Sequence, residues 1–179
     1  MLLPSVATQI ESDRAMDVDI CTGCGLKTEP HDGPTHTYLV SSSGCWAKYG
    51  ELLAREYQDI GYMAVHGLTV DAYALQHPGQ ENPQTIQSAR VHLASLFSYF
   101  EFGTPISDLN GVKQAIARHR TEFTWLVPPP ALTDINVSDV LTAETAIQHA
   151  QRVKVWAEYV FVGWKSHHAE ISRQLKACL

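Results

Sequence analysis

The sequence has little of what marks a membrane protein, a secreted protein or a nucleic-acid-binding protein. Its longer apolar stretches, such as residues 155 to 164, are far shorter than the ~20 residues that cross a bilayer. Residues 1 to 19 lack a basic segment and turn acidic early, which argues against a signal peptide. The 13 Lys and Arg form no run and are outnumbered by 19 Asp and Glu, which argues against nucleic acid as a partner. We expect a cytoplasmic protein with no membrane partner.

Cysteine is also scarce, with four in 179 residues. Thiols stay reduced in the cytoplasm, so these four residues do not predict a disulfide framework. Two of them, Cys21 and Cys24, form a Cys-x-x-Cys pair. A thioredoxin-type redox site needs a helix that starts at such a pair. Gly23, Gly25 and the prolines at positions 30 and 34 oppose a helix there, so the redox interpretation is the weaker one.

A zinc site fits the pair better. Glycine beside the second cysteine lets backbone N–H groups turn toward the sulfurs, and the pair offers two thiolates to one tetrahedral ion. His36 and Cys45 would complete a Cys3His set, with His31 as the alternative third ligand. The competing interpretation is that Cys45 is a small core residue and His36 a solvated histidine in a turn. We expect zinc as the cofactor, bound by Cys21, Cys24, His36 and Cys45.

Hydrophobic periodicity predicts an all-α fold, a single-domain bundle of about five helices behind an irregular, zinc-knuckle-like loop. The expected helices lie near 44–58, from Thr69 to a stop at Pro78, and near 84–101, 108–124 and 143–177. A short strand is expected at 36–40 and a helical turn after Ser138. The expected organisation is a loosely ordered leader over 1–19 and one domain over 20–179, which includes the metal-binding loop 20–45.

The sequence also resembles a family. The segments that carry the resemblance are CTGCGL, GPTHTY, GCWAKYGELLAREY, HGLTVDAYALQHPG, WLVPPP and VWAEYVFVGWKSHH. Together they resemble a family of bacterial proteins known only as a domain of unknown function, in which proline typically stands where this chain has Thr22. The resemblance implies no activity. It implies signature positions at Cys21, Cys24, His36, Cys45, His66, Asp71, Tyr73, His77, Pro78, His92 and His168.

Six polar residues on helical segments are candidates for an interior pocket: His66, Asp71, Tyr73, His77, His92 and His168. Tyr73 and His77 are four residues apart and share one helical face. His168 continues the apolar stripe of the last expected helix, so we predict that it is buried, that His167 is exposed, and that His168 shares a cavity with His77. The competing interpretation is that each polar group bonds to nearby backbone and no cavity forms.

Two functional hypotheses remain open at this point. The first is a zinc-stabilised helical module that binds a protein partner or a small molecule. The second is a metal- or histidine-dependent enzyme that acts on a small molecule, with a metal-bound water as the nucleophile. Motifs such as GxSxG and HExxH do not occur in the sequence, and no reaction is therefore predicted.

Overall fold

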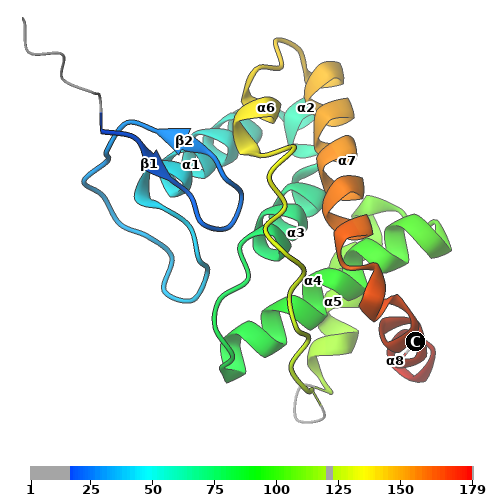
Figure 1. The fold of residues 1–179 in the computed structure, drawn as a ribbon. Helices are drawn as coiled ribbons and strands as arrows, with labels where there is room; N and C mark the ends of the chain where they lie inside the picture. The colour runs from blue at the N-terminus through cyan, green and yellow to red at the C-terminus, as the bar shows by residue number, and fades with distance from the viewer. Residues whose placement is uncertain (1–16, 120–122, 179) are drawn as a thin grey trace, which may run out of the picture.

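Helices make up most of the described chain (Figure 1), which confirms the all-α prediction. The computed structural model describes residues 17–119 and 123–178. Its helices are α1 (Ser43–Gln58), α2 (Ile60–Met63), α3 (His66–Gln76), α4 (Pro83–Phe102), α5 (Leu109–Ala117), α6 (Val137–Leu141), α7 (Ala146–Gly163) and α8 (His168–Cys178), with 3-10 turns at Ile106–Asp108 and Lys165–His167. Among these described residues, no helix is both long and apolar enough to cross a membrane.

Helix α3 is the central element of the bundle. It packs against α4 and α7, and α4 packs in turn against α5 and α8. Every residue from Asp71 to Gln76 is buried, so this helix has no solvent face over its second half. Four of its buried side chains are polar or amphipathic: Thr69, Asp71, Tyr73 and Gln76. Because burying an unpartnered polar group costs free energy, each of them must find a partner in the core.

The N-terminal loop packs beside α1 and begins with a two-stranded hairpin. Strand β1 (Asp19–Ile20) pairs antiparallel with β2 (Lys27–Thr28), in the register Asp19 to Thr28 and Ile20 to Lys27. The strand expected at residues 36–40 is wrong, because these described residues form bends instead. The backbone there bonds to the end of α3, with the Val40 N–H donating to the His77 carbonyl at 3.1 Å. Of the expected leader, residues 1–16 lie outside the described residues.

The last helix is divided, and the prediction of one helix over 143–177 is wrong. Helix α7 ends at Gly163, where the connector before α6 crosses it; a Cβ at this glycine would lie 2.8 Å from Leu132 Cδ1. The next residue, Trp164, is fully buried and its indole N–H donates to the Leu75 carbonyl at 3.1 Å. After this anchor a 3-10 turn redirects the chain so that α8 packs on α4. The apolar spacing continues past the break because α8 buries apolar residues of its own, Ile171 and Leu175.

The other helix limits follow local capping. Helix α1 starts after Ser42, whose hydroxyl accepts the Cys45 N–H at 3.2 Å. Helix α4 has an Asn82–Thr85 capping box at its start, and it ends at Phe102, capped by Gly103, which has a φ of +68°. Helix α5 ends at Ala117, earlier than expected, and residues 120–122 of its predicted extension lie outside the described residues.

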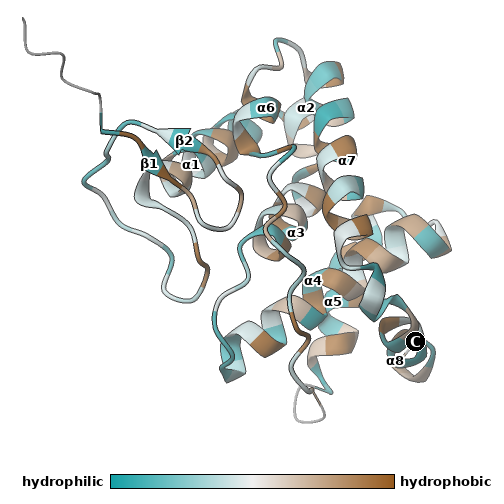
Figure 2. Cartoon of the chain, in the orientation of Figure 1, coloured by the Kyte–Doolittle hydropathy of each residue, from teal (hydrophilic) through white to brown (hydrophobic). Residues whose placement is uncertain are grey.

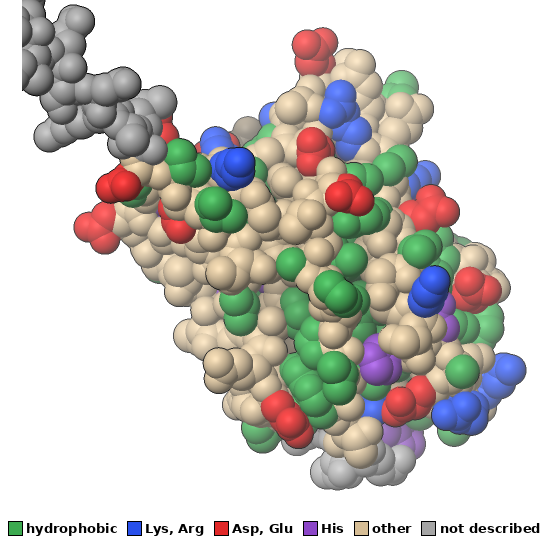
Figure 3. Space-filling model, viewed as in Figure 1, with side chains coloured by type: hydrophobic (Ala, Val, Ile, Leu, Met, Phe, Trp, Pro, Cys, Tyr) green, Lys and Arg blue, Asp and Glu red, His purple; other side chains and the backbone are tan. Residues whose placement is uncertain are grey.

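Hydropathy and charge are distributed as the helical periodicity requires. Figure 2 shows brown, hydrophobic positions alternating with teal ones along the helices. On the face seen in Figure 3, acidic and basic side chains are interspersed, and hydrophobic side chains gather between them. The basic side chains seen on this face do not form a continuous patch.

Candidate metal centre

Three cysteines and one histidine converge beside the N-terminal loop. They are Cys21, Cys24, Cys45 and His77, and their ligand atoms all lie within 4.8 Å of one another. The Cys45 sulfur lies 3.7 Å from the Cys24 sulfur and 3.4 Å from His77 Nε2. All four side chains are at most 1% exposed. A buried Cys3His cluster of this size has the donor set of a tetrahedral metal site.

The hairpin positions the first two sulfurs. Between its strands the chain makes a tight turn in which the Cys21 N–H donates to the Leu26 carbonyl at 2.9 Å and the Gly25 N–H donates to the Cys21 carbonyl at 2.7 Å. Gly25 has a φ of +71°, a conformation that side chains with a Cβ rarely adopt. The turn therefore folds Cys24 back toward Cys21, and glycine after the second cysteine is required by the backbone.

Two helix ends supply the other pair of ligand atoms. Cys45 lies in the first turn of α1, and His77 is the residue that caps the C-terminus of α3. His77 Nδ1–H donates to the Tyr73 carbonyl at 2.8 Å, which leaves Nε2 as the unprotonated nitrogen facing the sulfurs. A hydrogen bond to the far nitrogen is the usual support of a metal-binding histidine. Gly23 makes room for this ring, because a Cβ there would lie 2.5 Å from His77 Cδ2.

The three thiols share their protons unequally. Hydrogen bonds from the Cys24 and Cys45 thiols hold the pKa of Cys21 far below its usual value. The same contact with Cys21 raises the pKa of Cys24 to about 12, and contacts with both neighbours raise the pKa of Cys45 strongly. The cluster therefore holds one thiolate readily, whereas a second and a third need a compensating positive charge. A bound cation would supply that charge and release the protons.

Aromatic side chains enclose the cluster on its helical side. The Tyr73 hydroxyl lies 3.5 Å from the Cys45 sulfur, and the Tyr73 ring stacks on His77 at 4.1 Å and on Tyr49 at 3.8 Å between centroids. Burial raises the pKa of Tyr73 well above its usual value, so the phenol stays protonated and can donate to the sulfur. Such donors stabilise negative charge on thiolates and exclude water from them.

His36 does not join the cluster. The histidine beside the three sulfurs is His77, whereas the sequence led us to expect His36. Its imidazole packs edge-on against Tyr38 and Trp46, at 4.3 and 5.0 Å between centroids. The hydrogen bond between the Val40 N–H and the His77 carbonyl holds the loop against the end of α3. His77, at that end, therefore lies beside the sulfurs. His31, the other alternative, is exposed, and its carbonyl accepts a hydrogen bond from Ser43.

A model of DUF5946, a family of unknown function, matches residues 19–165. The chain belongs to this family. The match includes all four residues of the cluster, and it confirms the resemblance to a domain of unknown function. No curated protein and no solved structure matches the chain.

The six residues expected in one interior pocket occupy four different places. Tyr73 and His77 lie at the cysteine cluster, and Asp71 bonds to His92 at 2.7 Å on the other side of α3. His66 bonds to a buried carboxylate, that of Glu56. Helix α3 is buried around its circumference, so its polar residues point in different directions and meet different neighbours.

His168 is the sixth residue, and it lies among aromatic rings. It stacks on Phe161 at 4.0 Å between centroids, and its Nε2–H donates to the Phe161 carbonyl at 3.0 Å. His167 donates to the Val127 carbonyl at 2.8 Å. Both histidines are partly exposed, so the predicted contrast between a buried His168 and an exposed His167 is not observed. The break after α7 changes the rotation of the chain at these positions.

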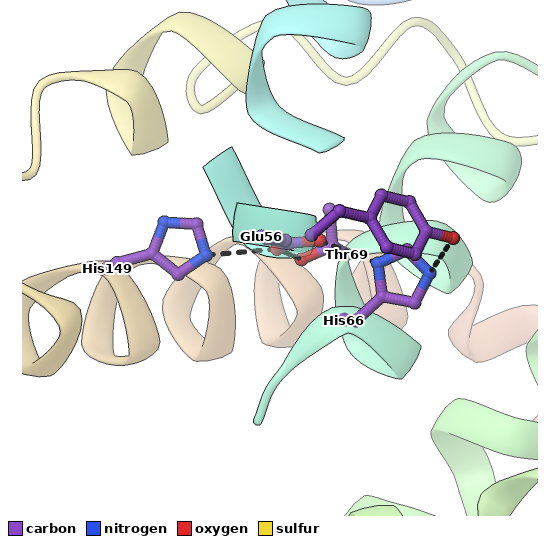
Figure 4. A network of polar contacts seen from close by, with 5 residues as sticks. Glu56, His66, Thr69 and His149 are labelled. Carbon is purple, nitrogen blue, oxygen red and sulfur yellow. Dashed lines mark hydrogen bonds and ion pairs between the residues drawn. The ribbon is translucent and has the colours of Figure 1, made fainter. Parts of the chain in front are cut away.

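A buried glutamate with three partners was not predicted from the sequence (Figure 4). Glu56 is 0% exposed and accepts hydrogen bonds from Thr69 at 2.5 Å, His66 at 2.7 Å and His149 at 2.9 Å. Burial raises the pKa of this carboxyl, but the three hydrogen bonds together outweigh burial and hold the pKa below its usual value. The carboxylate thereby ties α1 to α3 and α7.

A sequence signal for this glutamate did exist. The buried stripe of α1 runs through Cys45, Tyr49 and Leu52, and the next position at helical spacing is Glu56. A charged residue at a core position of an amphipathic helix indicates a buried partner. The pattern could have identified the glutamate, whereas its partner His149 is 93 residues away and has no local signal.

Proposed function

We propose that the protein binds one zinc ion through Cys21, Cys24, Cys45 and His77 and that this ion has a structural role. The observation that carries the proposal is the convergence of four ligand atoms within 4.8 Å of one another. Thiolates and imidazole prefer zinc to magnesium or calcium, and a Cys3His set is one of the usual structural zinc sites.

The number and burial of the ligands support a structural role over a catalytic one. Structural zinc sites have four protein ligands, whereas catalytic sites keep a position for water or substrate. Here four side chains, each at most 1% exposed, fill the coordination of a tetrahedral ion. Zinc would draw the thiols to thiolates, and Tyr73 would support both the His77 ring and the Cys45 sulfur.

The ion would join the N-terminal loop to the helices. Cys21 and Cys24 belong to the loop, Cys45 to α1 and His77 to the end of α3. None of residues 27–43 is fully buried, so apolar burial gives this segment little stability of its own. We infer a zinc-stabilised helical module whose ordered loop contributes to a surface for a partner, either a protein or a small molecule.

Metal analysis of purified protein tests the proposal. We expect about one zinc per chain in the natural protein and in Cys178→Ser, a matched control because Cys178 lies outside the cluster. Cys21→Ser should retain far less zinc. Cobalt substituted for zinc should give the intense thiolate-to-metal absorption of a cysteine-rich tetrahedral site. Zinc undiminished in Cys21→Ser, or absent from the natural protein, would contradict the proposal.

A further inference from the structure

A cleft of about 350 Å³ lies between α4 and α5, and none of the four residues of the cysteine cluster lines it. Its lining includes Tyr38 from the N-terminal loop, Ser88 and His92 from α4, and Lys113 and Ala117 from α5. Glutamine side chains from both helices add carboxamide groups to the walls. The cleft is therefore a concave site in which a few polar groups, among them His92 and Lys113, lie between apolar walls, which is the form of a small-molecule site.

A buried carboxylate lies behind these two side chains. Asp71 is 0% exposed, accepts hydrogen bonds from His92 Nδ1 at 2.7 Å and Ser95 Oγ at 2.6 Å, and forms an ion pair with Lys113 Nζ at 2.6 Å. His92 and Lys113 both line the cleft, with 18% of each side chain exposed. The carboxylate is thus shielded from the cleft and acts on it only through these two residues.

The contact with Asp71 determines which nitrogen of His92 faces a ligand. Because Nδ1 donates its proton to the carboxylate, the neutral ring carries a lone pair on Nε2. Within the described residues, no hydrogen-bond partner contacts Nε2. A histidine whose far nitrogen is held by a buried carboxylate has the arrangement of a general base.

Lys113 defines the second feature of a ligand. Its ammonium group has three N–H donors, and the observed ion pair with Asp71 needs one of them. The remaining donors are available to an electron-rich oxygen in the cleft. The glutamine carboxamides and the Ser88 hydroxyl are neutral, so the ammonium is the strongest donor that a ligand would meet.

We propose that this cleft binds a small molecule carrying an oxyanion, a carboxylate or phosphate group, with Lys113 contacting the oxyanion and His92 Nε2 accepting a proton from the ligand or from a bound water. In that step an O–H bond of the ligand or water breaks, its electron pair stays on the oxygen, and an N–H bond forms at Nε2. Asp71 stabilises the resulting imidazolium and is a positioning residue, because it does not reach the cleft. The site is independent of the metal proposal.

The tautomer of His92 is the first test. Long-range ¹H–¹⁵N correlation spectra of the zinc-loaded full chain, with His92 assigned through His92→Gln, report which ring nitrogen carries the proton. We expect the proton on Nδ1, and in Asp71→Asn a shift of the tautomer population toward Nε2–H. A proton on Nε2 in the natural protein would contradict the role of His92 as a base.

Titration with sodium acetate and, separately, with inorganic phosphate tests the oxyanion site and distinguishes the two ligand classes. We expect one of them to shift the His92 ring resonances saturably at constant ionic strength, with sodium chloride as the control. Ala117→Phe fills the cleft without touching Asp71 and should reduce the fitted affinity at least tenfold. Lys48→Met removes one positive charge from exposed α1 and should leave the affinity unchanged.

Removal of the Lys113 ammonium group gives a second test of the oxyanion site. Lys113→Met alone leaves a buried carboxylate without its ion pair, so the informative variant is Asp71→Asn with Lys113→Met, which removes both charges. We expect this double variant to fold and to lose the saturable shift. A shift by neither acetate nor phosphate in the natural protein, or an equal shift in Ala117→Phe, would show that the cleft is not an oxyanion site.

Discussion

His77 Nε2 lies 3.4 Å from the Cys45 sulfur, although 32 residues separate the two in the sequence. This contact joins the end of α3 to the start of α1, and the two loop cysteines complete the group around it.

The first prediction concerns this histidine. His77→Gln should lower zinc affinity by more than about 10–100-fold. That range is typical when a residue that only hydrogen-bonds to a ligand is replaced, and His77 is itself a proposed ligand. Competition with a chromophoric chelator measures the affinity.

His36→Gln is the matched control for that substitution. His36 packs on Trp46 and lies outside the cluster, so its replacement should leave zinc affinity within a few-fold of the natural value. If His36→Gln loses zinc and His77→Gln keeps it, the assignment of the fourth ligand would be reversed.

The second prediction tests the space that Gly23 leaves for the His77 ring. In Gly23→Ala the new Cβ would lie 2.5 Å from His77 Cδ2 and 2.7 Å from the Val40 carbonyl oxygen, so both must move. We expect the free energy of unfolding to fall by about 1–3 kcal/mol, as for overpacking in a core. Gly50→Ala in α1 meets no atom within 4 Å and should instead stabilise the protein by about 0.5–1 kcal/mol. Urea denaturation of both zinc-loaded variants measures the difference.

The third prediction is a pH dependence that arises at Glu56. Its pKa is lower in the folded than in the unfolded protein, so its contribution to stability is complete above the pKa of an unfolded glutamate, about 4.3. The contribution is lost as the pH falls through the folded pKa. Near neutral pH, Glu56→Gln should lower the free energy of unfolding by about 1.5–3 kcal/mol, the range for hydrogen bonds to a charged group.

As the pH falls below about 4.3 and then through the lowered folded pKa of Glu56, the difference between natural protein and Glu56→Gln should shrink, because the carboxyl group becomes neutral like the carboxamide. Denaturation of both proteins at a series of pH values measures this difference in the free energy of unfolding. Because both proteins lose zinc at low pH, the effect of that loss is removed when one value is subtracted from the other. Glu51→Gln, on the exposed side of the same helix, should change stability by less than about 1 kcal/mol. A constant difference down to pH 3 would rule out ionised Glu56 as its source.

The fourth prediction concerns removal of the metal. The Val40 amide bonds to the His77 carbonyl at 3.1 Å, so it reports on docking of the loop against α3. A chelator should accelerate hydrogen exchange at Val40 at least tenfold and leave Leu93, in the core of α4, nearly unchanged. Equal acceleration at both amides would mean that the whole bundle depends on the ion, and no acceleration at Val40 would mean that the loop does not.

Much of the helical fold could be predicted from the sequence because its signals are local. The stripe of α1, the Pro78 stop after α3 and the start of α4 depend on spacing and on caps within a few residues. The division between α7 and α8 could not be predicted in this way. It depends on contact between Gly163 and Leu132, which comes from the path of a connector in space.

The candidate metal centre was predictable in part for the same reason. Cys21 and Cys24 form a local pair, and Cys45 follows within the same stretch of chain. The fourth residue depends on where the loop meets the helices. His36 is nearer in sequence, but it packs on Trp46, whereas the C-terminus of α3 places His77 beside the sulfurs. Sequence spacing gives no information about such an approach.

The odd number of thiols in the cluster has a consequence for oxidation. Disulfides consume thiols in pairs, and the Cys24 and Cys45 sulfurs are 3.7 Å apart, so peroxide acting on metal-free protein should join two of the three and leave one reduced. The remaining thiol lies within 4.8 Å of the new bond and can attack it, so the disulfide would exchange among Cys21, Cys24 and Cys45. The oxidised, metal-free protein could not bind zinc again until a reductant restored all three thiols. The fraction of chains that hold zinc would therefore fall as the fraction that has been oxidised rises.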